Sequence, residues 1–136
     1  MREERANRGA GAGHTLVRVG LGARSYDIII GGGLLKASAG PIATAVPGAR
    51  CAIVSDTNVA ALYLPCLKSE LSRAGLYLGE VAVAPGEASK SFPVLADLCE
   101  QLLRLGVERG DVVVALGGGV VGDLAGFAAS ILRRGV

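Results

Sequence analysis

The sequence has few of the residues that mark several common classes of protein. Its 136 residues include no tryptophan, two phenylalanines and three tyrosines, so it lacks the aromatic platforms on which proteins stack single-stranded nucleic acid. The net charge is only +2, without the basic stripe of a nucleic-acid-binding face. Its three cysteines lie far apart without C-x-x-C spacing, which disfavours a disulfide or zinc framework.

The N-terminal stretch carries little structural signal. Residues 1–13 lack apolar periodicity and are rich in glycine and charge, so we expect a disordered extension. The single histidine, His14, follows this stretch and is expected to be a solvated residue, not a metal ligand. No early apolar stretch follows a basic start, so we expect no secretory signal. Together with the unpaired cysteines, this indicates a reducing, cytoplasmic location.

The rest of the chain predicts an α/β fold in one domain, residues 14–136. Two β-branched runs, 15–21 and 26–31, predict an N-terminal β-hairpin, and 34–46 a short helix interrupted before Pro41. Apolar strands and helical patterns then alternate, which is typical of a Rossmann-like parallel sheet flanked by helices, with strands buried on both faces. The strands are predicted at 51–56, 77–83 and 111–116.

The helical patterns between and after these strands also carry specific expectations. Leu62 and Tyr63 belong to the apolar spacing of the first helix, and Phe92 to that of the second. Pro65 predicts a turn or kink within the first helix.

Ligands of open parallel sheets bind beyond the carboxyl ends of the strands, where helix N-termini converge. The segments at these positions read "SDTN", "APGEASK" and "GGGVVGD". Each is polar or rich in glycine and carries at least one acid. We therefore predict that the three loops form one ligand site.

The last loop has the spacing of a phosphate-binding turn. Gly117, Gly119 and Gly122 satisfy G-x-G-x-x-G directly after a predicted strand and at the start of a helix. The usual fingerprint follows the first strand and has an acid about 20 residues later, whereas this one follows a late strand. A membrane span over Val112–Leu132 has the right length but places Asp123 near its centre, at a cost of about 2.5–3.5 kcal/mol.

The charged and polar residues of the loops each have two interpretations. Asp123 either complements the dipole of its helix in the first turn or binds ligand. Asp56 and Asn58 are good N-cap residues, but side chains beyond the one that caps are available to a ribose or base. Glu87 and Lys90 either form an exposed ion pair of little energetic value or bind ligand hydroxyls and phosphate.

The combination of "SDTNVAALY", "PGEASKSF" and "VALGGGVVGDLAGFAASILRRGV", in that order, resembles the N-terminal nucleotide-binding domain of 3-dehydroquinate synthase. The resemblance runs from about Thr15 to Val136. In the wider superfamily, which includes glycerol and iron-containing alcohol dehydrogenases, a serine usually follows the three glycines. Val120 and Val121 stand here instead and favour the synthase branch.

The resemblance implies roles for individual residues. Four residues match family residues that contact the adenosine part of NAD: Asp56, Asn58, Glu87 and Lys90. The remaining matches are Gly118, Gly119 and Val120 at the pyrophosphate, Asp123 near the nicotinamide side, and Arg134 at the substrate phosphate, whereas Arg133 has no such counterpart.

The family reaction converts 3-deoxy-D-arabino-heptulosonate 7-phosphate into 3-dehydroquinate and phosphate in the shikimate pathway, a lyase reaction of aromatic amino acid biosynthesis. It uses NAD catalytically and a divalent metal, zinc or cobalt, whose ligands lie in a C-terminal helical domain. The sequence stops before that domain, so we expect no metal ligands on this chain and no activity from it alone. The resemblance suggests a homodimer, and from the composition and the position of Asp123 we expect neither nucleic-acid nor membrane partners. The alternative is a stand-alone nucleotide-binding module, or a fragment of a related polyol or alcohol dehydrogenase without synthase activity.

Overall fold

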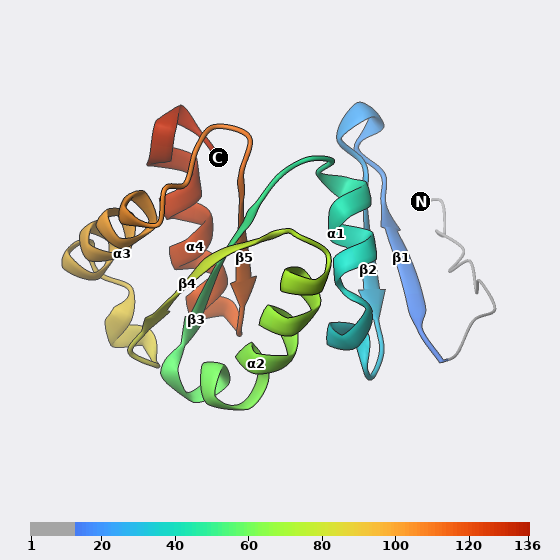
Figure 1. The fold of residues 1–136 in the computed structure, drawn as a ribbon, viewed down its shortest axis with the longest axis horizontal. Coiled ribbons are helices and arrows are strands. Elements are labelled where there is room, and N and C mark those ends of the chain that lie inside the picture. Colours follow the sequence, from blue (N-terminus) through green and yellow to red (C-terminus); the bar gives the residue numbers. More distant parts are fainter. Residues whose placement is uncertain (1–12) are drawn as a thin grey trace, which may run out of the picture. The chain divides into compact units, whose positions relative to one another are not determined.

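A computed structural model describes residues 13–136 of the chain (Figure 1). The predicted disordered extension, residues 1–13, lies outside the described residues except for its last position. The chain divides into two compact units, one ending at Leu34 and the other comprising Leu35–Val136. The single domain expected over 14–136 stays a prediction.

The first unit contains the predicted β-hairpin. Strands β1 (Thr15–Val19) and β2 (Tyr26–Ile30) pair antiparallel in a continuous register. A short 3₁₀ turn, Gly22–Arg24, joins them. The Ser25 hydroxyl fixes this turn because it accepts from the N–H of Leu21 at 2.9 Å and donates to a carbonyl of the turn at 2.7 Å. The alternating β-branched runs thus predicted both strands and their connection.

The short helix after the hairpin is interrupted before Pro41, as predicted. A 3₁₀ segment, Leu34–Ala37, is followed by α1 (Ala39–Ala45), so the interruption falls at Ser38. Pro41 lies inside the first turn of α1, where a backbone N–H has no intrahelical acceptor and its loss costs nothing.

The second unit is built on a parallel sheet of three strands in the order β4-β3-β5 (Figure 1). The strands are β3 (Cys51–Asp56), β4 (Tyr77–Val83) and β5 (Val112–Leu116), as predicted to within a residue. Burial on both faces holds for β3, whose Cys51 to Val54 are fully buried. The outer strands are only partly buried, since each has a paired neighbour on one side alone.

Helices cover both faces of this sheet, which confirms the predicted α/β class. Residues of α1 and α2 (Thr57–Arg73) contribute to the apolar cluster on one face. On the other face, α3 (Phe92–Arg104) and α4 (Gly119–Ile131) pack their leucines, valines and alanines against the sheet. Two further 3₁₀ segments, Glu87–Ser89 and Leu132–Arg134, adjoin α3 and α4.

Helix α2 differs from expectation in two ways. It continues through Pro65 as one element. Ala61 and Pro65 are both exposed, so the carbonyl that loses its intrahelical donor belongs to the solvent side of the helix. The buried side chains of this helix are Leu67 and Leu71, whereas Leu62 is 72% exposed despite its helical spacing.

The amino ends of β3 and β5 are joined by a nearly buried carboxylate. Asp111 accepts from the Arg50 guanidinium at 2.6 and 3.0 Å, from the Arg50 backbone N–H at 3.2 Å and from the Glu108 N–H at 2.8 Å. Hydrogen bonds from the Arg50 side chain, and then from these backbone groups, hold the pKa of Asp111 below its ordinary value. Because the folded-state pKa is lowered, the ionised carboxylate stabilises the fold.

We predict that Asp111→Asn lowers the free energy of unfolding at pH 7 by about 1–3 kcal/mol, because charge-assisted hydrogen bonds to a buried group are lost. The difference from wild type should be complete above the unfolded-state pKa of about 3.9. It should disappear as the pH falls through the lower folded-state pKa of Asp111. Urea denaturation at a series of pH values measures it. A difference that stays constant down to acid pH would contradict the role of the ionised carboxylate.

Candidate functional site

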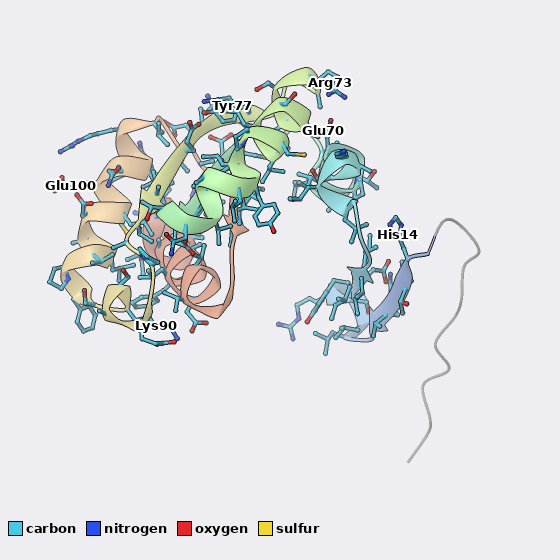
Figure 2. All side chains as sticks on the ribbon, turned by 90° about the horizontal axis from the view of Figure 1, so that it is seen from below. His14, Glu70, Arg73, Tyr77, Lys90 and Glu100 are labelled. Carbon is cyan, nitrogen blue, oxygen red and sulfur yellow. The ribbon has the colours of Figure 1, made fainter. Side chains whose placement is uncertain are left out.

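The three predicted loops lie at one edge of the sheet. Because β3, β4 and β5 are parallel and adjacent, their carboxyl ends meet at the same side. Figure 2 views the molecule from this side and labels Lys90 there. None of the helices described within residues 13–136 has the length and hydropathy to cross a membrane. Val112–Leu132 instead forms a strand, a glycine turn and a helix.

The loop predicted after β3 is a direct junction between strand and helix, since β3 ends at Asp56 and α2 begins at Thr57. Asp56 is the N-cap of α2, and its Oδ1 accepts from the N–H groups of Asn58 and Val59, both at 2.9 Å. The capping interpretation therefore holds for Asp56. Asn58 is exposed, and its side chain makes no hydrogen bond to any of the described residues. Asn58, in the first turn of α2, is thus the side chain of this junction that is available to a ligand.

The loop after β4 has a fixed backbone that presents two charged side chains. Gly86 adopts φ +96°, a conformation that favours glycine, and the segment Glu87–Ser89 then forms one 3₁₀ turn. The buried Ser89 donates its hydroxyl proton to the Ala84 carbonyl oxygen at 2.5 Å. Ser91 caps α3, its hydroxyl oxygen accepting from the Val94 N–H at 3.4 Å. Glu87 and Lys90, between these fixed points, remain exposed.

Lys90 connects this loop to α4. Its Nζ lies 2.7 Å from Asp123 Oδ2 and 3.3 Å from Glu87 Oε2. Hydrogen bonds to Asp123, and then to Glu87, raise the pKa of Lys90. The Glu87–Lys90 pair is one of the two arrangements expected from the sequence. The shorter contact with Asp123 was not predicted, since nothing in the spacing of two distant residues indicates it.

Asp123 does not occupy the position that the dipole interpretation requires. Helix α4 begins at Gly119, and its first turn contains no acid. Asp123 follows in the second turn and is 69% exposed. Because the effect of the helix dipole is confined to the first turn, the ion pair with Lys90 is the better physical account of its place.

The glycines before α4 differ in what the fold requires of them. The predicted context is confirmed, since Gly117 follows β5 directly and Gly119 begins α4. A Cβ atom added at Gly117 would lie 2.8 Å from a methyl group of Val121. One added at Gly118 or Gly119 would meet no atom within 4 Å, and neither residue has a positive φ. Folding therefore does not demand glycine at 118 and 119, and their bare backbone leaves the helix N-terminus accessible.

Val120, next in the turn, is partly buried and packs against the apolar cluster beneath α3 and α4. Its side chain thus anchors the turn, and only its backbone is a candidate for ligand binding. Gly122 donates its N–H to the Gly118 carbonyl at 3.0 Å, which closes the first turn of the helix.

The Lys90–Asp123 pair borders a hollow of about 340 Å³ between α3 and α4, which sequence reasoning missed. Phe92, whose spacing predicted a core position, is 80% exposed, and Phe127 of α4 is 52% exposed. The other residues that line the hollow are Ser91, Leu95 and Leu124. Amphipathic periodicity identified Leu95 correctly but could not show that the helix start projects beyond the core.

Arg134 is placed at the far end of α4. The helix starts at the carboxyl edge of the sheet and ends at Ile131, before the 3₁₀ segment that contains Arg134. Arg133 and Arg134 both have positive φ, 48° and 67°. Within residues 13–136, Arg134 forms no ion pair, whereas Arg133 lies 3.5 Å from Glu108. The structure of this chain therefore does not bring Arg134 to the other predicted site residues.

Metal-ligating side chains do not gather in the described part of the chain, where no group of three or more histidines, cysteines, aspartates or glutamates could hold an ion. His14 Nε2 lies 3.0 Å from the Gly32 carbonyl oxygen. The cysteines, at 51, 66 and 99, are not disulfide-bonded. The expectation that the chain holds no metal stays a prediction.

Comparison with known proteins agrees with this geometry. Residues 80–136 match the family model described as 3-dehydroquinate synthase N-terminal. The 3-dehydroquinate synthases of Mesorhizobium japonicum and Brucella ovis are 50% and 53% identical over 120 residues, 88% of this chain. The chain spans about a third of these relatives, 32% of the length of each.

Solved structures share the fold. A 2-deoxy-scyllo-inosose synthase superposes with a TM-score of 0.74 at 23% identity, covering 90% of this chain and 34% of that one. A 2-epi-5-epi-valiolone synthase from Streptomyces hygroscopicus, solved with NAD⁺ and Zn²⁺ bound, gives 0.68 at 30% identity, covering 86% and 32%.

The chain therefore has the α/β fold found over about a third of these synthases. Within that class its sequence is similar to 3-dehydroquinate synthase, so the resemblance predicted from the three loops is confirmed.

We predict that an alanine substitution destabilises the fold at Gly117 but not at Gly119. Gly117→Ala should destabilise the fold by about 1–3 kcal/mol, because its methyl group overlaps the buried Val121. Gly119→Ala should leave stability within about 0.5 kcal/mol of wild type or raise it, because no atom lies nearby. Urea denaturation of the two variants measures this. Equal destabilisation would show that the fold itself requires both glycines.

Proposed function

We propose that this chain is the NAD-binding part of a 3-dehydroquinate synthase. The observation that carries the proposal is the accessible backbone of Gly118 and Gly119 at the start of α4, beside the charged groups of the β4–α3 loop. The relatives named 3-dehydroquinate synthase, at about half identity over 88% of the chain, support it.

The residues of the carboxyl edge fit a dinucleotide. The N–H groups of the exposed Gly118 and Gly119, at the N-terminus of α4, suit the pyrophosphate, because helix N-termini bind anions. The exposed Asn58 and Glu87 side chains suit the hydroxyl groups and polar edges of a nucleoside. Asp56 is largely committed to capping α2, so we assign it an orienting role beside Asn58. When bound, NAD supplies reversible hydride transfer with the substrate.

We propose that the substrate of the whole enzyme is the phosphorylated sugar acid of the family reaction. The resemblance gives Arg134 a contact with the substrate phosphate in the whole enzyme, whereas in this chain Arg134 lies at the other end of α4 from the carboxyl edge. A 2-deoxy-scyllo-inosose synthase solved with carbaglucose-6-phosphate, NAD⁺ and Co²⁺ has this fold. The divalent metal would be held by the C-terminal domain of the family, as would the rest of the catalytic machinery. We further propose a cytoplasmic homodimer without nucleic-acid or membrane partners.

NAD should bind the chain in a manner that depends on Gly119. We predict that Gly119→Val abolishes binding measured by isothermal titration calorimetry, because its branched side chain would cover the accessible N-terminus of α4. Gly126→Val is the matched control, since this exposed glycine of the same helix also has no atom within 4 Å of an added Cβ. It should bind like wild type. Equal affinity of Gly119→Val and wild type would refute the site.

The chain of 136 residues should not release phosphate from the family substrate when NAD and zinc are supplied. Each 1.36 kcal/mol of lost transition-state stabilisation is about a tenfold loss of rate, and the Lewis acid alone contributes several kcal/mol. A separately expressed C-terminal part of a full-length relative should restore release in a mixture. Activity of the chain alone would overturn the expectation, and a mixture that binds NAD but stays inactive would favour a nucleotide-binding module.

A further inference from the structure

The carboxyl edge carries an excess of negative charge next to the place proposed for an anion. Lys90 is paired with two acids, Asp123 at 2.7 Å and Glu87 at 3.3 Å. Asp56 adds a further carboxylate at the start of α2. An anionic group at the start of α4 therefore approaches a region in which acids outnumber the lysine.

Asp123 is the acid whose position matters most for such a group. It follows Gly119 by four residues in α4, so the two lie on the same face of the helix. Helical side chains lean toward the N-terminus. The Asp123 carboxylate is accordingly directed toward the turn whose bare backbone is accessible, and an unpaired charge there would repel a phosphate.

Lys90 is held where it offsets this charge. Its own N–H donates to the Glu87 carbonyl at 3.0 Å. The neighbouring Ser89 is fixed by its hydrogen bond to the Ala84 carbonyl, and Ser91 by its role as a helix cap. The backbone position of Lys90 is thus determined by the loop without the ion pair. Its side chain is 36% exposed, and its ammonium reaches across to α4.

We propose that Lys90 is a positioning residue that neutralises Asp123, so that the pyrophosphate group of a dinucleotide can bind at the N-terminus of α4. The proposal rests on the proposed function. Lys90 then favours anion binding mainly by neutralising the charge of Asp123, and not by direct contact with the phosphate. Removal of the lysine is then harmful chiefly because it leaves Asp123 unpaired.

The test is a double-mutant cycle with inorganic pyrophosphate as the probe, measured by calorimetry at low ionic strength. Lys90→Met should weaken pyrophosphate binding about tenfold or more, since uncompensated exposed charges act strongly at low salt. Asp123→Asn should strengthen it. The double variant Lys90→Met/Asp123→Asn should recover to within about threefold of wild type, which is under 1 kcal/mol. A double variant as weak as Lys90→Met would show that the ammonium itself holds the anion and would overturn the proposal.

Lys68→Met is the matched control. Lys68 forms an ion pair of similar length, 2.8 Å to Glu80, away from the three loops. It should leave pyrophosphate affinity unchanged. Because both pairs are partly exposed, neither substitution should lower the melting temperature substantially, and circular dichroism checks that all variants remain folded. If Lys68→Met loses as much pyrophosphate affinity as Lys90→Met, the loss comes from the changed net charge of the protein, and the proposal is contradicted.

NAD separates this inference from the proposed function. If wild type binds NAD but the double variant does not recover pyrophosphate affinity, the proposal for Lys90 is overturned and the proposed function stands. Failure of wild type to bind either NAD or pyrophosphate would overturn both.

Discussion

The complete burial of β3 is the constraint on which the second unit depends. Cys51, Ala52, Ile53 and Val54 have no accessible surface, so a paired strand is required on each side and a helical layer on each face. Both neighbours run parallel to β3. Parallel pairing requires each connection to cross back over the sheet. The segment that follows each strand therefore begins at the same edge, the carboxyl edge of the sheet. The candidate site is a direct consequence of this topology.

The two edges of the sheet have different physical roles. At the amino edge, Asp111 is 7% exposed and accepts hydrogen bonds from the Arg50 side chain and backbone N–H, which join β3 and β5, and from the nearby Glu108 N–H. At the carboxyl edge, Lys90 and Asp123 remain accessible, and Gly119 leaves backbone uncovered. The hydrogen bonds that hold the strands together thus lie at the amino edge, and the accessible side chains and backbone lie at the carboxyl edge. The carboxyl-edge loops can therefore vary in their ligand contacts without loss of the strand register.

Local patterns in the sequence were sufficient for the strands and for the G-x-G-x-x-G turn, because alternation, apolar runs and glycine spacing reflect local backbone geometry. Periodicity does not show whether an apolar position is covered, and the exposure of Leu62 and Phe92 was missed for this reason. The Lys90–Asp123 contact was missed because it depends on how α3 and α4 lie on the sheet. The continuation of α2 through Pro65 depends on packing after the proline, which propensity does not describe.

The most direct test of the account is a titration of the ¹⁵N-labelled chain with NAD, followed by two-dimensional NMR. The account predicts that amide resonances shift at Gly118 and Gly119, at the start of α2 around Asn58 and in the loop that contains Lys90, because these three segments form one site. Resonances around Asp111, at the opposite edge, should stay unchanged. Shifts centred on the Asp111 edge, or in only one of the three loops, would contradict the claim that the loops bind a single cofactor.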